Sequence, residues 1–178
     1  MKNLVFVLPL FISLFSIDSY GQLADLLKAD LIKEWQGAKE YTKQYLDAMP
    51  NEKYNFKPTA GVRTFAEQML HLAHANTGHI FYGTSIPKIW EGKDLEKRKS
   101  AQSSDSVKYF VMSSYDYAIR SITKMDAKML GERNKIATYD FLRYTWIMGG
   151  FKHQIHHRAQ TTVYLRLVRV TPPEENIL

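Results

Sequence analysis

Residues 140–168 read DFLRYTWIMGGFKHQIHHRAQTTVYLRLV, and no other segment says more about the architecture. Its apolar residues recur at helical spacing, and Pro172 and Pro173 follow it, which predicts one long helix ending near Val168. His153 and His157 are four residues apart, so both side chains lie on one face of that helix. Two imidazoles at this spacing can hold one divalent ion, and the helix already orders their backbone.

Two adjacent glycines, Gly149 and Gly150, interrupt the middle of this predicted helix. A glycine costs roughly 1 kcal/mol in a helix interior relative to alanine. The pair therefore predicts either a close contact with another helix or a kink.

Three earlier segments also carry apolar residues at helical spacing and are bounded by helix-stopping residues. Thr64 and Glu67 predict a capping box at the start of the second of them. Four long helices with two long connections predict an all-α protein, a four-helix bundle, and such bundles build metal sites from facing helices. The expected helices are residues 24–49, 65–82, 105–124 (after the cap Ser104) and 140–168.

Two connections separate the later helices. Residues 84–103 contain Pro87, Gly92 and a mixed charge cluster, which favours a solvated crossover linker, with a lid loop or a short helix at Asp94–Lys99 as alternatives. Residues 125–138 are expected to form a second irregular connection.

Composition excludes several classes of protein. The length of 178 residues fits one domain, and an apolar fraction of 45% excludes general disorder. The absence of cysteine excludes disulfide scaffolds, thiolate zinc sites and iron–sulfur clusters. A net charge of +6 weakly favours anionic partners. Basic and acidic residues are interleaved and no nucleic-acid motif is present, so we expect no nucleic-acid partner.

Residues 1–21 have the pattern of a signal peptide. Lys2 precedes an apolar run over residues 4–17, and the small residues Ser19 and Gly21 stand before a cut at Gln22. The run is shorter than the roughly 20 residues that span a membrane. We therefore expect export to the periplasm or the medium, with residues 22–178 as a soluble domain that does not bind the membrane. The alternative is an uncleaved anchor.

The remaining ligand of a metal site must come from another helix. His71 is the best candidate because it lies among apolar residues of the second helix. Three histidines leave a position open for water, as in catalytic sites. Zinc is the first choice of metal and nickel the next. His74, His79 and His156 are interpreted as ordinary core or surface histidines.

Other residues near the histidine pair are candidates for catalytic roles. In zinc proteases of the HExxH type a glutamate follows the first histidine, but here Gln154 stands there and cannot act as a base. Gln160 is a candidate to hydrogen-bond a ligand, or else a packing residue. Arg158 is a candidate to pair with an anionic substrate, or else with an acidic neighbour.

The segments around these histidines resemble the two conserved blocks of the DinB-like family. One block is H153QIHHRAQ160, which is followed by YLRL at residues 164–167 and by Pro172 and Pro173. The other block is R63TFAEQMLHLA73, and YNFKP at residues 54–58 resembles the family's entry to the second helix. The resemblance covers residues 22–173. Ala159 replaces the usual glycine, and His74 stands where many members carry an acidic residue.

This resemblance implies a four-helix bundle with His71, His153 and His157 as ligands of one metal, whereas His156 matches a histidine that is not a ligand. Members with assigned activities are thiol-dependent transferases or isomerases, and a homodimer would be in keeping with the family. Two hypotheses follow. The protein is a metal-dependent enzyme of hydrolase or thiol-transferase type, or it is a non-enzymatic metal-binding or interaction module.

Overall fold

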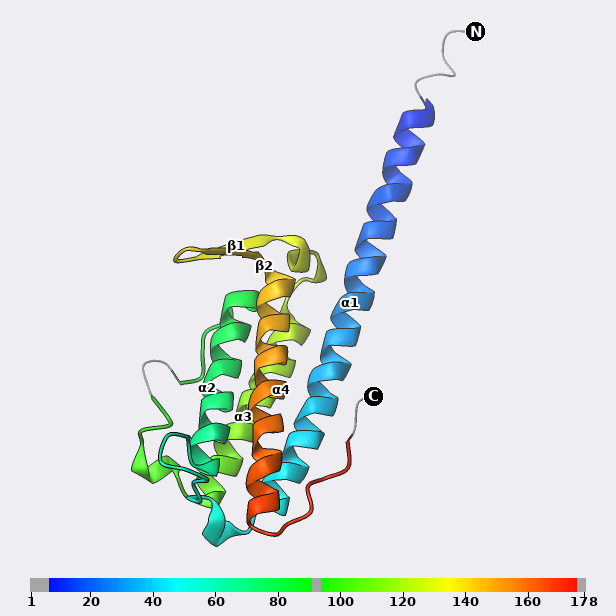
Figure 1. Ribbon diagram of the computed structural model, residues 1–178. Helices are drawn as coiled ribbons and strands as arrows, with labels where there is room; N and C mark the ends of the chain where they lie inside the picture. The colour runs from blue at the N-terminus through cyan, green and yellow to red at the C-terminus, as the bar shows by residue number, and fades with distance from the viewer. Residues whose placement is uncertain (1–6, 91–93, 176–178) are drawn as a thin grey trace.

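In the computed structural model, which describes residues 7–90 and 94–175, four long helices form one bundle (Figure 1). The predicted all-α four-helix bundle is confirmed. The helices are α1 (Val7–Ala48), α2 (Phe65–Thr84), α3 (Ser104–Lys124) and α4 (Arg143–Leu167).

Helix α1 begins at Val7 and not near Ala24, as the apolar spacing predicted. The leucine- and phenylalanine-rich segment favours helix by itself, and Gly21 alone does not break it. Figure 1 shows the first turns of α1 extending beyond the other helices. Contacts with the bundle include Lys28 Nζ, which donates to the carbonyl of Met125 at 2.7 Å. Among the described residues, no helix is long and apolar enough to span a membrane.

The start of α2 follows the predicted capping box. The Glu67 amide donates to Thr64 Oγ1 at 3.1 Å, and the Thr64 amide donates to Glu67 Oε2 at 2.7 Å. Helix α3 is capped by Ser103, whose Oγ accepts from the Ser106 amide at 3.3 Å, so the prediction of Ser104 as the cap was wrong by one residue.

The connection between α2 and α3 is packed on the bundle. Leu95 and Ala101 are fully buried, so the predicted solvated linker is wrong at these positions. A short 3₁₀ helix, η2, covers Lys99–Ala101, and no helix forms over residues 94–98. Residues 91–93, with part of the predicted charge cluster, lie outside the described residues. A second 3₁₀ helix, η1 (Asn51–Lys53), follows α1.

A β-hairpin precedes α4 where an irregular connection and the first turn of the helix were expected. After the 3₁₀ helix η3 (Ala127–Gly131), the antiparallel strands β1 (Arg133–Ile136) and β2 (Tyr139–Leu142) pair with Arg133 opposite Leu142. The helix therefore starts at Arg143 and not at Asp140. Asp140 instead belongs to the hairpin, where its Oδ1 accepts from Arg133 Nε at 3.1 Å.

Helices α2 and α4 are close neighbours, and the glycine pair lies at their contact. A Cβ placed on Gly150 would lie 2.8 Å from Cβ of His79, and one on Gly149 would lie 3.2 Å from His79 Nδ1. The predicted close helix contact at these glycines is confirmed. It brings the histidine-bearing faces of the two helices together.

Candidate metal centre

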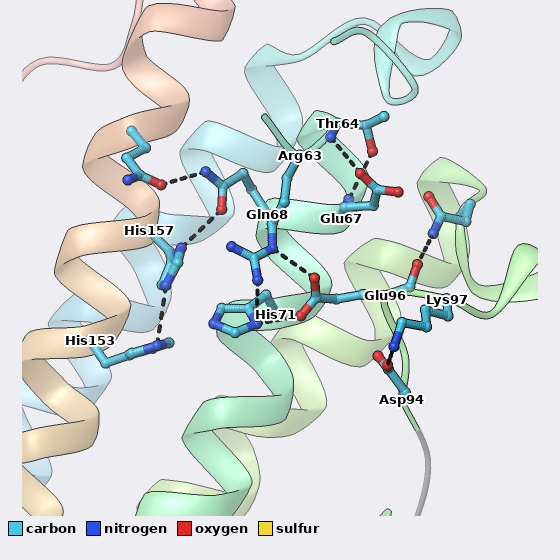
Figure 2. A network of polar contacts seen from close by, with 12 residues as sticks. Arg63, Thr64, Glu67, Gln68, His71, Asp94, Glu96, Lys97, His153 and His157 are labelled. Atoms are coloured by element: carbon cyan, nitrogen blue, oxygen red, sulfur yellow. Dashed lines mark hydrogen bonds and ion pairs between the residues drawn. The ribbon is translucent and has the colours of Figure 1, made fainter. Parts of the chain in front are cut away.

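Three histidines from two helices converge at one point. His71 comes from α2, and His153 and His157 come from α4 (Figure 2). Each offers a ring nitrogen, and these nitrogens all lie within 4.8 Å of one another. The Nε2 atoms of His153 and His157 are 3.2 Å apart. The structure thus brings together the three residues that the sequence predicted, and one ion between them could contact all three rings.

The outer nitrogen of His71 is held by a carboxylate. His71 Nδ1 pairs with Glu96 Oε1, and Arg63 Nε donates to the other carboxylate oxygen, Oε2, at 2.7 Å (Figure 2). A neutral imidazole has one N–H and one lone pair. Because Nδ1 donates to Glu96, the lone pair of His71 is on Nε2. A histidine held in this way is typical of metal sites, where a carboxylate fixes the ring and raises its basicity.

The outer nitrogen of His157 is held by a buried amide. His157 Nδ1 donates to Gln68 Oε1 at 2.9 Å, and Gln68 Nε2 in turn donates to Gln160 Oε1. Gln160 Nε2 then donates to His156 Nε2 at 3.0 Å. This chain orients the lone pair of His157 Nε2 toward His153. The candidate Gln160 therefore lies in an outer layer, where it contacts Gln68 and His156 and none of the three converging histidines.

Arg158 points away from the histidines. It is buried, and its Nη1 donates to Gln154 Oε1 at 2.8 Å and to Thr42 Oγ1 at 3.2 Å. Its guanidinium carbon lies 4.5 Å from the ring centroid of Tyr41. These contacts join α4 to α1. The structure thus places the candidate Arg158 in the bundle interior and not at the site.

Burial keeps two of the three rings neutral. Loss of solvent, together with the nearby His71 and His79, lowers the pKa of His153 to about 4. Loss of solvent, together with His153 and His71, lowers the pKa of His157 to about 3. Near neutral pH both rings hold free lone pairs, which is the form that binds a metal.

The other three histidines lie outside the convergence. His74 is exposed, and His156 is exposed with its contact to Gln160. His79 is half-buried, with its ring centroid 5.9 Å from that of His153. Their interpretation as core or surface histidines agrees with these positions.

Sequence reasoning missed the residues that hold the histidines from outside. Gln68 could have been found, because it stands three residues before His71 on the same face of α2. Glu96 and Arg63 lie in irregular segments on either side of α2, where no periodicity indicates which way a side chain points.

The comparisons with known proteins agree with this architecture. A model of the DinB family matches residues 22–178. A DinB-like protein from Bacillus cereus ATCC 10987 has a TM-score of 0.70 at 20% identity, over 82% of this chain and 95% of that one. A DinB-like protein from Bacillus subtilis has a TM-score of 0.62 at 12% identity, over 82% and 96%. At these identities the two structures show a shared fold. No curated protein matches the chain.

Proposed function

Because the chain belongs to the DinB family, we propose that its three converging histidines bind one divalent metal and that the protein is a metal-dependent enzyme. The observation that carries the proposal is the way in which the rings are held. Glu96 and Gln68 occupy the outer nitrogens of His71 and His157, so the Nε2 lone pairs of both rings are free for an ion.

The donor set favours zinc first and nickel next, since imidazole nitrogens suit both ions. Three protein ligands would leave a bound ion a position for water or a thiol, and the ion would lower the pKa of the group bound there. The chain's own residues position the rings. Glu96 and Gln68 fix the orientation of two ligands, and the burial of His157 excludes water from behind the site.

Two reaction types fit this arrangement, hydrolysis by an activated water and transfer to or from a thiol. The family resemblance favours thiol chemistry. The predicted export of the chain favours hydrolysis, because the low-molecular-weight thiols that such transferases and isomerases use are cytosolic. Substrates of both reaction types should therefore be screened.

The first test is the metal content of protein purified without a histidine tag. Elemental analysis is expected to find close to one zinc or nickel per chain, and the His157→Ala variant should retain almost none. His74→Ala is the matched control, because His74 is an exposed histidine of α2 outside the convergence. Full retention of metal by His157→Ala, with native helicity by circular dichroism, would rule out this site.

A second test separates an enzyme from a non-enzymatic metal-binding module. Cobalt is substituted for the native metal, and the visible spectrum is recorded during titration with azide and with a small thiol. An open coordination position predicts spectral changes that saturate with each ligand. A spectrum that neither ligand changes would contradict the catalytic proposal and favour a metal that only stabilises the fold.

A further inference from the structure

A hollow of about 1040 Å³ opens beside residues that contact the three histidines, and its wall carries more cationic than anionic side chains. Four cationic side chains against two carboxylates leave an excess of two positive charges. We call it the basic hollow, and its charged wall residues are Lys57, Arg63, Lys97, Lys99, Glu67 and Glu96.

Both carboxylates of the basic hollow are already engaged. Glu67 Oε2 accepts from the Thr64 amide at 2.7 Å in the capping box. Glu96 uses one oxygen for His71 and the other for Arg63. Among the described residues neither carboxylate forms an ion pair with Lys57 or Lys99, so the positive charge of these two lysines is left for a ligand.

Two of the cations have no partner of their own. Lys57 and Lys99 are exposed, and over residues 7–90 and 94–175 neither side chain makes a hydrogen bond or an ion pair. Lys97 differs, since its Nζ lies 3.0 Å from Asp94 at the surface (Figure 2). Concave surfaces lined by one sign of charge concentrate ions of the opposite sign. Lys57 and Lys99 are therefore the groups available to bind an anion.

The basic hollow is continuous with the histidine site. Gln68, Glu96 and Arg63 all line it, and these residues contact the histidines. Gln68 holds His157, Glu96 holds His71, and Arg63 Nη2 lies 3.3 Å from His71 Nδ1. Figure 2 shows Arg63 beside both Glu96 and His71. A molecule that fills the hollow therefore lies against the residues that position the metal ligands.

We propose that the basic hollow binds the anionic end of a small substrate, a carboxylate or phosphate group, while the rest of the molecule reaches the histidine site. This substrate class rests on the proposed function of the site. Lys57 and Lys99 supply the free charge, and Arg63 adds a third cation nearest to the reacting group.

The test measures anion binding and metal content separately. Zinc-loaded protein and metal-depleted protein are each titrated with inorganic phosphate and with succinate by calorimetry, against sodium chloride at equal ionic strength. The Lys57→Gln/Lys99→Gln variant removes both unpaired cations. Lys33→Gln/Lys124→Gln is the matched control, because it lowers the net charge equally at exposed lysines outside the hollow.

We expect saturable binding of phosphate or succinate to the wild-type protein. Binding to Lys57→Gln/Lys99→Gln should be about tenfold weaker, and binding to the control variant should be as tight as to the wild-type protein. No binding beyond the chloride level, or equal binding by the two double variants, would overturn the proposal. If metal content is near one per chain while anions do not bind, the substrate class is wrong and the metal site stands. If lysine-dependent binding occurs without any metal uptake, the basic hollow stands and the proposed function fails.

Discussion

His71 donates a hydrogen bond from its ring Nδ1 to one carboxylate oxygen of Glu96, a residue 25 positions further along the sequence. The pair joins a connection that was expected to be a solvated linker to the centre of α2. It predicts that this connection contributes directly to metal affinity.

Replacement of Glu96 by Gln should weaken zinc binding by about 10- to 100-fold, because the carboxylate no longer fixes the ring and raises its basicity. Competition with a chromophoric chelator measures the change. Asp94→Asn is the control, since the Asp94 carboxylate lies at the surface of the same segment, where it pairs with Lys97 and with the backbone of residues 96 and 97. Equal zinc affinity in Glu96→Gln and the wild-type protein would contradict this role.

Replacement of Gln68 by Ala should lower the free energy of unfolding of the metal-free protein by about 1–3 kcal/mol, because the buried Nδ1–H of His157 loses its acceptor. Urea denaturation measures the loss. Gln160→Ala removes only the exposed end of the same hydrogen-bond chain, so its effect should stay within about 0.5 kcal/mol. Similar losses in the two variants would show that His157 does not depend on Gln68.

Replacement of Arg158 by Met should reduce stability by about 1–3 kcal/mol and leave the metal content unchanged. The guanidinium bonds to Gln154 and Thr42 in the interior, away from the histidines. Denaturation and elemental analysis of the same sample test both halves of the prediction. Loss of metal from a stably folded Arg158→Met variant would contradict the prediction and show that Arg158 is required for metal binding.

Acid should destabilise the metal-free protein through its buried histidines. An unfolded histidine has a pKa near 6.5, whereas burial lowers the pKa of His153 to about 4 and that of His157 to about 3. At a pH between the unfolded and the folded pKa values, these two histidines bind protons in the unfolded chain but not in the folded chain. The stability present above pH 6.5 is therefore lost as the pH falls through this window.

Thermal denaturation of metal-free protein from pH 7.5 to pH 4.5 tests this pH dependence. The His153→Gln/His157→Gln variant carries no titrating group at these two positions, so its melting temperature should fall less steeply with pH. Parallel curves for the variant and the wild-type protein would mean that other groups control acid stability.

Export remains a prediction from the first 21 residues. We expect the mature protein to begin at Gln22, which intact-mass measurement of protein from the periplasm or the medium would show. A mass that includes residues 1–21 would favour the uncleaved anchor.

Local rules predicted most of the bundle. The capping box at Thr64 and Glu67 follows from two residue types at one spacing, and the glycine pair at residues 149 and 150 indicated the helix contact that now involves His79. The helix repeat likewise predicted that His153 and His157 share a face, whereas His71 was added from its apolar neighbours in the second helix and from the family resemblance.

The hairpin before α4 gave no comparable signal. Its strands are four residues each and mostly exposed, so no apolar alternation marks them. The turn contains Ala137 at a φ of 52°, where glycine or asparagine would have indicated a turn. Glu96 was missed for a related reason: its position depends on the burial of its neighbour Leu95, which is a tertiary effect.

The contact between Gly150 and His79 limits how closely α2 and α4, the two helices that carry the three converging histidines, approach each other. A methyl group there would meet the Cβ of His79 at 2.8 Å, and α2 and α4 would have to move apart. His71 is carried by one of these helices and His153 and His157 by the other. The distance between His71 and the two histidines of α4 thus depends on a contact made at a residue that has no side chain.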